Sequence, residues 1–220
     1  MSTLIKNGRV VTAADDYRAD VLIDGGRIAA IGHDLAAGPG VDVHDAEGLL
    51  VLPGGVDVHT HLDSESPTSH TVDTFATGGK AAAFGGTTTV VDFCNQIRGG
   101  SLMASFEAWR KRAECTPIDV GAHMIIVDFG PSSAAEMERL MTGEGVTSFK
   151  LFTAYPGALM VDDGTLLQAM RAAGRHGGQI SVHCENGHII QMLVDEAVAA
   201  GNLVPRHHML TRPPVAEGEE

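Results

Sequence analysis

The sequence predicts an α/β fold in two parts: a small all-β domain over residues 1–53, then part of a (β/α) barrel over residues 54–220. Short apolar runs broken by turn-forming residues fill the first part, which is typical of strands. The second part alternates strand-like runs with helix-length amphipathic stretches at intervals of about 30 residues, which indicates parallel β-α units. The chain of 220 residues, 44% of them hydrophobic, can form a core of this extent.

The small N-terminal domain is expected to be a β-sandwich. Two apolar runs at 19–24 and 27–31 flank Gly25-Gly26 and predict a β-hairpin. Further strands are predicted at 4–11, 41–43 and 49–52. His33 and His44 each stand alone in turn-rich sequence, so we predict structural roles for both.

Five β-α units are predicted after Gly54. Their strands are expected at 56–62, 87–93, 119–128, 148–154 and 179–185, and their helices at 72–84, 102–114, 132–141, 165–176 and 187–200. Serines at the start of the third helix predict its N-cap. A further helix is expected to begin in the last ten residues, TRPPVAEGEE.

Such units build either an open doubly wound sheet or part of an eight-stranded TIM barrel. The barrel is favoured because polar candidates lie near the carboxyl ends of strands, where barrel enzymes place their active sites. No G-x-G-x-x-G or Walker pattern follows a strand, which argues against a nucleotide site. Because a barrel needs eight strands and the fifth would be an unpaired edge, we expect the chain to be the N-terminal part of a longer polypeptide.

Composition limits the partners. The 28 acidic and 15 basic residues give a net charge of −13, which argues against nucleic acid and anionic membranes as partners. The sequence has neither a signal-peptide pattern nor an apolar run of the ~20 residues needed to span a bilayer. Three cysteines without a Cys-x-x-Cys pattern indicate a reducing compartment, so we expect a cytoplasmic protein.

The first barrel strand carries a candidate metal site. In PGGVDVHTHLD, residues 53–63, apolar and polar residues alternate as in a strand, where positions i and i+2 share a face. His59 and His61 are therefore expected to project side by side, close enough to share one metal ion. By contrast, His70, His188, His207 and His208 are expected to be surface residues.

Two later strands carry further candidates. Lys150 lies between the apolar residues Phe149 and Leu151, and burying a lysine there is costly unless it has a function. It could be a Schiff-base nucleophile, a carbamate formed with carbon dioxide, or a lysine paired with a buried carboxylate. His183, in SVHCEN, is either a core residue or a further ligand, and the preceding candidates favour a ligand.

The order His59, His61, Lys150, His183 on successive strands resembles the metal-dependent amidohydrolase superfamily. The strings GGVDVHTHLD, AAAFGGTTTVVDF, SFKLFTAYPG, HCENG and TRPP are similar to the cyclic amidases, the dihydropyrimidinase and D-hydantoinase family. This resemblance extends over the whole chain.

The resemblance implies a centre of two divalent metal ions. His59 and His61 would bind the more buried ion and His183 the second. Lys150, carboxylated by carbon dioxide or bicarbonate, would bridge them. Imidazole and oxygen ligands suit zinc best, with manganese or cobalt as alternatives. The family's further histidine and catalytic aspartate lie on later strands and match no position here, so this chain alone is expected to be inactive.

The resemblance also implies a substrate. Tyr155 would hydrogen-bond the substrate carbonyl and its developing oxyanion, and Phe152, Tyr155 and the loop 64–75 would contact the ring substituent. The activity implied is opening of dihydropyrimidines or 5-substituted hydantoins to N-carbamoyl amino acids through a metal-bridging hydroxide. A homo-oligomer, commonly a tetramer, is implied as well.

Two alternatives to this activity stay open, an allantoinase-like cyclic amidase and a non-catalytic scaffold. Asp63 stands where dihydroorotases carry an arginine, which argues against that activity. The loop SESPTSHTVDTF departs from the usual hydantoinase string, so the preferred ring substituent stays open.

Overall fold

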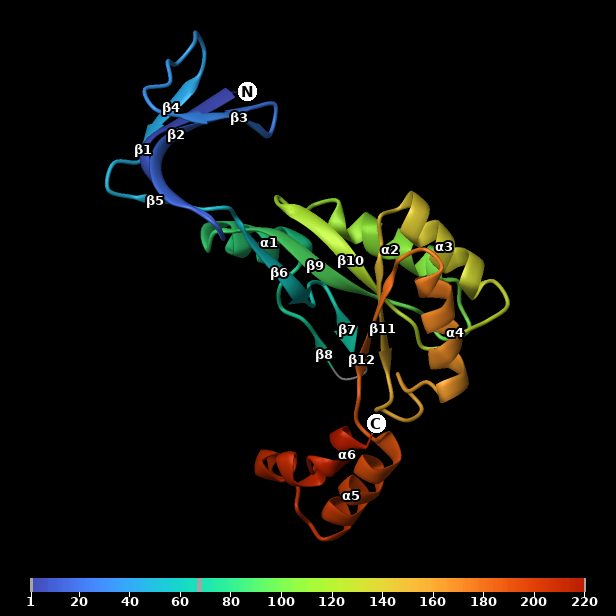
Figure 1. The fold of residues 1–220 in the computed structure, drawn as a ribbon. Helices are drawn as coiled ribbons and strands as arrows, with labels where there is room; N and C mark the ends of the chain where they lie inside the picture. Colours follow the sequence, from blue (N-terminus) through green and yellow to red (C-terminus); the bar gives the residue numbers. More distant parts are fainter. Residues whose placement is uncertain (1, 67–68, 220) are drawn as a thin grey trace. The chain divides into compact units, whose positions relative to one another are not determined.

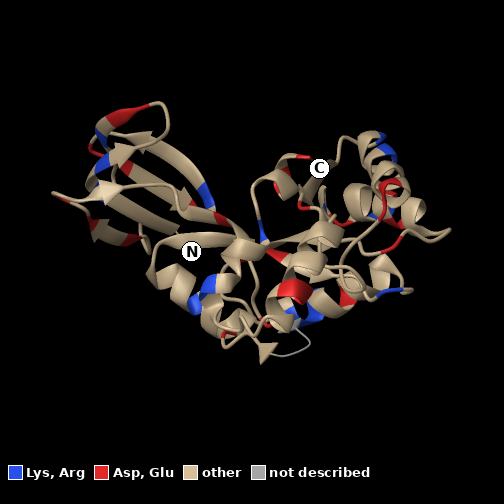
Figure 2. Cartoon of the chain, turned by 90° about the horizontal axis from the view of Figure 1, so that it is seen from below, with Lys and Arg blue, Asp and Glu red and all other residues tan. Residues whose placement is uncertain are grey.

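The structure, a computed structural model, describes residues 2–66 and 69–219. The chain divides into two compact units, Met1–Gly55 and Val56–Glu220. Strands make up the first unit, and strands alternate with helices in the second (Figure 1). Acidic and basic residues are interspersed in both units rather than separated between them (Figure 2).

One five-stranded sheet forms the first unit, in the order β3-β2-β1-β4, with β5 also paired to β1. Its strands are β1 (Ser2–Val11), β2 (Asp16–Asp24), β3 (Arg27–Gly32), β4 (Asp42–Asp45) and β5 (Leu50–Val51). β1, β2 and β3 are antiparallel neighbours, whereas β4 and β5 run parallel to β1. The buried side chains Val10, Ala19 and Val21 form a small apolar cluster on this sheet.

The predicted hairpin of the first unit is confirmed. Asp24 of β2 pairs with Arg27 of β3 across Gly25 and Gly26. Both glycines have positive φ angles, 56° and 76°, which a two-residue hairpin turn requires and glycine adopts without steric cost.

A five-stranded sheet in the order β12-β11-β10-β9-β6 forms the centre of the second unit and curves as half of a barrel (Figure 1). Neighbouring strands from β9 to β12 are parallel, as predicted for β-α units. The strands are β6 (Gly55–Thr60), β9 (Thr87–Asn95), β10 (Asp119–Ile125), β11 (Ser148–Phe152) and β12 (Gln179–His183). The helices are α1 (Phe75–Phe84), α2 (Leu102–Ala113), α3 (Ser133–Gly143), α4 (Asp163–Gly174), α5 (Gly187–Ala199) and α6 (Val215–Gly218), with 3-10 turns η1 (Pro205–His207) and η2 (Met209–Thr211).

The two faces of this sheet have different roles. Helices α2, α3 and α4 cover one face (Figure 1), and the main apolar core lies between them and the strands. Phe149 and Leu151 of β11 are fully buried in that core. Because side chains alternate along a strand, Lys150 and Phe152 lie on the opposite face. That face carries a second apolar cluster, in which Phe152 packs against Phe93 and its neighbours.

Helix ends follow their capping residues. Helix α1 begins at Phe75, later than predicted, because Thr74 caps it and accepts a hydrogen bond from the Thr77 amide. Asp162 caps α4 in the same way. Ser132 occupies the N-cap position of α3 as predicted, but it has helical backbone angles and makes no side-chain cap bond. None of the helices in the described ranges is both long and apolar enough to cross a membrane.

Four predicted strands end too late. β6 ends at Thr60, β10 at Ile125, β11 at Phe152 and β12 at His183, two or three residues before the predicted ends. The chain leaves the sheet at these points to form the loops that follow. His61 therefore lies one residue beyond its strand.

Part of the predicted substrate loop 64–75 forms a two-stranded ribbon. β7 (Glu65–Ser66) pairs with β8 (Ser69–His70) in antiparallel fashion. Pro67 and Thr68, which belong to the same predicted loop, lie outside the described residues.

Candidate active site

A cavity of about 630 Å³ lies at the carboxyl ends of the parallel strands. All five strands of the second unit, or the residues just after them, contribute to its lining: His59, His61, Ser64, Phe93, Asn95, Ile125, Lys150, Phe152, Tyr155, Ala158, Leu159 and His183. In (β/α) barrels this edge of the sheet is where active sites form, because loops from several strands meet there. Every residue that the sequence analysis selected for chemistry lies in this lining.

His59 and His61 form an imidazole pair on one wall of the cavity. Their ring centroids are 5.4 Å apart. The ring of Phe93 on β9 supports both, stacking on His61 at 4.8 Å and lying 4.7 Å from His59. Burial lowers the pKa of His61, which favours the neutral imidazole that can donate a lone pair to a metal.

Lys150 reaches the cavity from the centre of the sheet. Its Nζ lies 5.1 Å from the centroid of the Phe152 ring. Burial lowers the pKa of this amine and so favours its neutral, nucleophilic form. Among the described residues, none hydrogen-bonds or ion-pairs with Nζ. The alternative of a lysine paired with a buried carboxylate is therefore not supported.

His183 lies across the cavity from the histidine pair, at the end of β12. Its Nε2 is 2.6 Å from Oε2 of Glu185, two residues further along the chain. A carboxylate accepts hydrogen bonds, so Nε2 is the donor in this contact and Nδ1 is the nitrogen not engaged by Glu185. The sequence analysis missed Glu185, although its i, i+2 spacing from His183 is compatible with a contact on one strand face.

Tyr155 follows β11 in a left-handed backbone conformation, with φ of 64°. A bulky residue rarely adopts this region, and such residues collect at functional sites. The amides of Ala158, Leu159 and Met160 donate to the Tyr155 carbonyl and hold this turn. Its ring lies 5.5 Å from that of His183 and 5.9 Å from that of Phe152, so it forms part of the cavity rim.

The chemistry of these side chains suits divalent metal ions, but together they form an incomplete set of ligands. Imidazole nitrogens are good ligands for zinc, and a neutral amine can be converted to a carbamate that offers oxygen ligands. Within residues 2–66 and 69–219, no three His, Cys, Asp or Glu side chains converge closely enough to hold a metal ion. The cavity thus offers a histidine pair, an amine and a separate histidine rather than a closed coordination shell.

Behind the histidine pair lies Asp92 on β9, which the sequence analysis did not select. Its carboxylate accepts hydrogen bonds from the Thr60 hydroxyl, the Leu62 amide and the Trp109 indole N–H. Burial raises the pKa of Asp92, and these three hydrogen bonds act in the opposite direction. Alternation along β9 turns Asp92 toward helix α2 while its neighbour Phe93 faces the cavity.

Six other histidines are assigned to structural or surface positions from the sequence. None of those predicted as structural or surface residues lines the cavity: His33, His44, His70, His188, His207 and His208. His44 lies 3.0 Å from a carboxylate oxygen of Asp42, and His70 lies 3.4 Å from one of Asp63.

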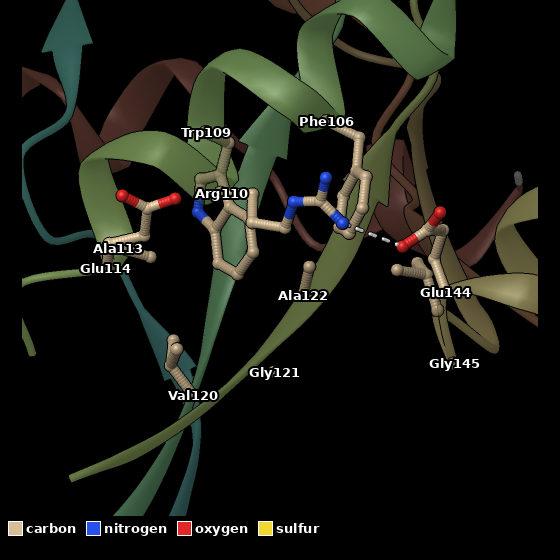
Figure 3. A pocket seen from close by; sticks show the side chains of 11 residues that line it. Phe106, Trp109, Arg110, Ala113, Glu114, Val120, Gly121, Ala122, Glu144 and Gly145 are labelled. Carbon is tan, nitrogen blue, oxygen red and sulfur yellow. Dashed lines mark hydrogen bonds and ion pairs between the residues drawn. The ribbon is translucent and has the colours of Figure 1, made fainter.

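A second cavity of about 460 Å³ lies near the start of β10 (Figure 3). Trp109 and Phe106 of α2 line it with Val120 and Gly121. Arg110 enters it but is already paired with Glu144 at 3.0 Å. The amino-terminal side of a barrel sheet serves stability rather than catalysis, so we assign no reaction to this cavity.

Comparison with known proteins gives consistent matches. The model of the amidohydrolase family matches residues 50–207. The whole chain is 45% identical to the D-hydantoinase of Geobacillus stearothermophilus, of which it covers 46%. Over 98% of its length it is 40% identical to the dihydropyrimidinase of Arabidopsis thaliana, of which it covers 40%.

Solved structures agree with these relatives. The crystal structure of dihydropyrimidinase from Brevibacillus agri superposes with a TM-score of 0.95 at 47% identity, covering 100% of this chain and 48% of that one. The chain therefore spans about half the length of the relatives it matches. The family model covers most of the second unit, including all the candidate site residues. The chain belongs to the amidohydrolase family.

Proposed function

We propose that the protein carrying this chain hydrolyses cyclic amides, opening a dihydropyrimidine or a 5-substituted hydantoin to an N-carbamoyl amino acid. The observation that supports this most is the single cavity that His59, His61, Lys150 and His183 share. The relatives named D-hydantoinase and dihydropyrimidinase support the substrate class.

We propose that the cavity holds two divalent ions, with zinc as the first candidate and manganese or cobalt as alternatives. His59 and His61 would hold one ion, His183 the other, and Lys150 would join them as a carbamate. Its neutral amine adds to carbon dioxide and releases one proton, and the lowered pKa of Lys150 favours that neutral amine. When bound, such ions polarise an amide carbonyl and lower the pKa of water.

The chain's own residues then orient the substrate. Tyr155 at the rim would donate its phenol proton in a hydrogen bond to the substrate carbonyl, whose oxygen gains charge as the ring opens. Phe152 would pack against the ring substituent. Glu185 would keep the His183 ring in one orientation through the bond to Nε2.

We propose the rest of the architecture from the similarity to the same relatives. The five-stranded sheet of the second unit would form part of an eight-stranded barrel, and the N-terminal sheet would form part of a β-sandwich, in a homo-oligomer. The three cysteines are free, Cys94 among them buried, which supports a reducing, cytoplasmic location.

Hydrolysis of dihydrouracil and hydantoin tests the proposal. The protein in its natural full length, supplied with bicarbonate and Zn²⁺ or Co²⁺, should convert at least one of these two substrates to its N-carbamoyl product. Chromatography of the reaction mixture measures the product. Lys150→Met should abolish turnover, whereas the surface variant Met170→Ala should retain it. Opening of allantoin alone would favour the allantoinase-like alternative. No turnover of any of the three, after full metal loading, would favour a scaffold.

A further inference from the structure

Asp92 is a charged side chain buried where the proposed chemistry does not use it. It is 1% exposed and lies on β9 against Trp109 of helix α2. Burying a carboxylate is costly unless hydrogen bonds replace its water. Its three bonds do so, but an apolar residue would fill the same space without that cost. The three hydrogen bonds, rather than the packing, are therefore what distinguishes Asp92 from an apolar residue at this position.

Two of the three bonds hold the chain on either side of His61. Oδ2 of Asp92 accepts from the Thr60 hydroxyl at 3.1 Å and from the Leu62 amide at 2.7 Å. β6 ends at Thr60, so His61 itself has left the strand. One carboxylate oxygen therefore fixes the residues before and after His61, where strand pairing no longer fixes the backbone.

The next residue on β9 supports the other end of the same side chain. The Phe93 ring stacks on the His61 ring at 4.8 Å with an angle of 15° between the planes. Asp92 and Phe93 face opposite sides of the strand, so β9 holds the backbone around His61 from one side and its imidazole from the other. The His59 ring also contacts Phe93, at 4.7 Å.

We propose that Asp92 is a positioning residue that holds the Thr60–Leu62 segment so that His59 and His61 present their imidazoles together to one metal ion. This inference rests on the proposed metal site. Asp92 touches neither substrate nor metal in this account, and it acts through the backbone on both sides of His61. A purely structural Asp92 would contribute to folding stability alone and leave the metal affinity of the folded protein unchanged.

Cobalt titration of the metal-free, full-length protein separates these two roles. The absorption of bound Co²⁺ reports the affinity, and urea unfolding of the same metal-free samples reports stability. Asp92→Asn keeps the shape but places an amide group against one of the donors. Thr60→Val removes one donor beside His61 at constant shape. Trp109→Phe is the control for stability, because of the three donors to Asp92 it removes only the one on α2, together with part of a buried ring.

Loss of positioning should weaken Co²⁺ binding by about 10- to 100-fold in Asp92→Asn, the range found when groups supporting metal ligands are removed. Thr60→Val should weaken it by about fivefold, as expected for one lost hydrogen bond. Trp109→Phe should lower the urea midpoint, while its Co²⁺ affinity should equal that of the parent. If Asp92→Asn does not fold, Thr60→Val against Trp109→Phe decides the question.

Equal Co²⁺ affinity in parent, Asp92→Asn and Thr60→Val would overturn the inference while leaving the metal site intact. So would an equal loss of affinity in Thr60→Val and Trp109→Phe, because that pattern would follow stability. A parent protein that binds no Co²⁺ would instead contradict the proposed metal site itself, and this inference with it.

Discussion

Replacing Lys150 by methionine should remove metal binding without a large loss of stability in the metal-free protein. Lys150 lies between the fully buried Phe149 and Leu151, but its own side chain faces the cavity. Its Nζ has no hydrogen-bond or ion-pair partner among the described residues, and the Phe152 ring lies 5.1 Å away. Methionine preserves most of the stem and deletes the amine.

The expected size of the stability change follows from that environment. A swap that conserves volume without removing a polar contact costs less than about 1.5 kcal/mol in free energy of unfolding. A lysine that paired with a buried carboxylate would cost roughly 3–5 kcal/mol on removal, because the partner charge would be left uncompensated. The two cases differ enough for urea unfolding to separate them.

The pH dependence gives a second check of the same change. Burial lowers the pKa of Lys150 in the folded protein, so the unfolded chain binds this proton more tightly. The amine therefore destabilises the parent at neutral pH, and this penalty shrinks as pH rises toward the ordinary lysine pKa of about 10.4. The free energy of unfolding of Lys150→Met should exceed that of the parent by the most at pH 7 and by the least at pH 10.

Urea unfolding of metal-free parent and variant at both pH values, followed by circular dichroism, measures these differences. Metal content after reconstitution measures the functional loss on the same samples. A large loss of stability in Lys150→Met would mean that the lysine has a structural partner. Unchanged metal content would refute its role as a ligand.

Three further predictions concern packing, reactivity and capping. Leu151→Ala should lower the free energy of unfolding by about 2–5 kcal/mol because Leu151 is fully buried, whereas exposed Met170→Ala should change it by less than about 0.5 kcal/mol, both by urea unfolding. Burial raises the pKa of the Cys94 thiol to about 12. At pH 8 iodoacetamide should therefore label the exposed Cys115 and not Cys94, which mass spectrometry measures. Rapid labelling of Cys94 in folded protein would contradict its burial. Asp162→Ala should lower the free energy of unfolding at pH 7, because the cap of α4 is lost. Because the helix amide lowers the pKa of Asp162, this difference should disappear in urea titrations as pH falls through that lowered pKa, and a constant difference would exclude the cap.

Periodicity in the sequence predicted the elements well because each signal is local. Strict alternation around His59 and the turn at Gly25-Gly26 both correspond to the observed backbone. Alternation in SFKLF correctly turned Phe149 and Leu151 to one face and Lys150 to the other. The ends of four strands were predicted too late, because where a strand stops depends on pairing with its neighbours and on the loop that follows.

Long-range contacts of the site were beyond the sequence. Asp92 reads as an ordinary strand residue, and only the fold brings Thr60, Leu62 and Trp109 to its carboxylate. The left-handed turn at Tyr155 depends on three amides further along the chain that meet its carbonyl. The structure brings the candidate residues to one cavity, and their role as metal ligands stays a prediction.

Metal analysis of the full-length protein tests the central claim most directly. After reconstitution with Zn²⁺ and bicarbonate and removal of free ions, mass spectrometry of the elements should find close to two zinc ions per subunit. When the bicarbonate is labelled with ¹³C, carbon NMR of the same samples should show a carbamate signal from Lys150. This signal should be absent from Lys150→Met. No retained zinc, together with no labelled carbamate, would contradict the two-metal centre on which the proposed function rests.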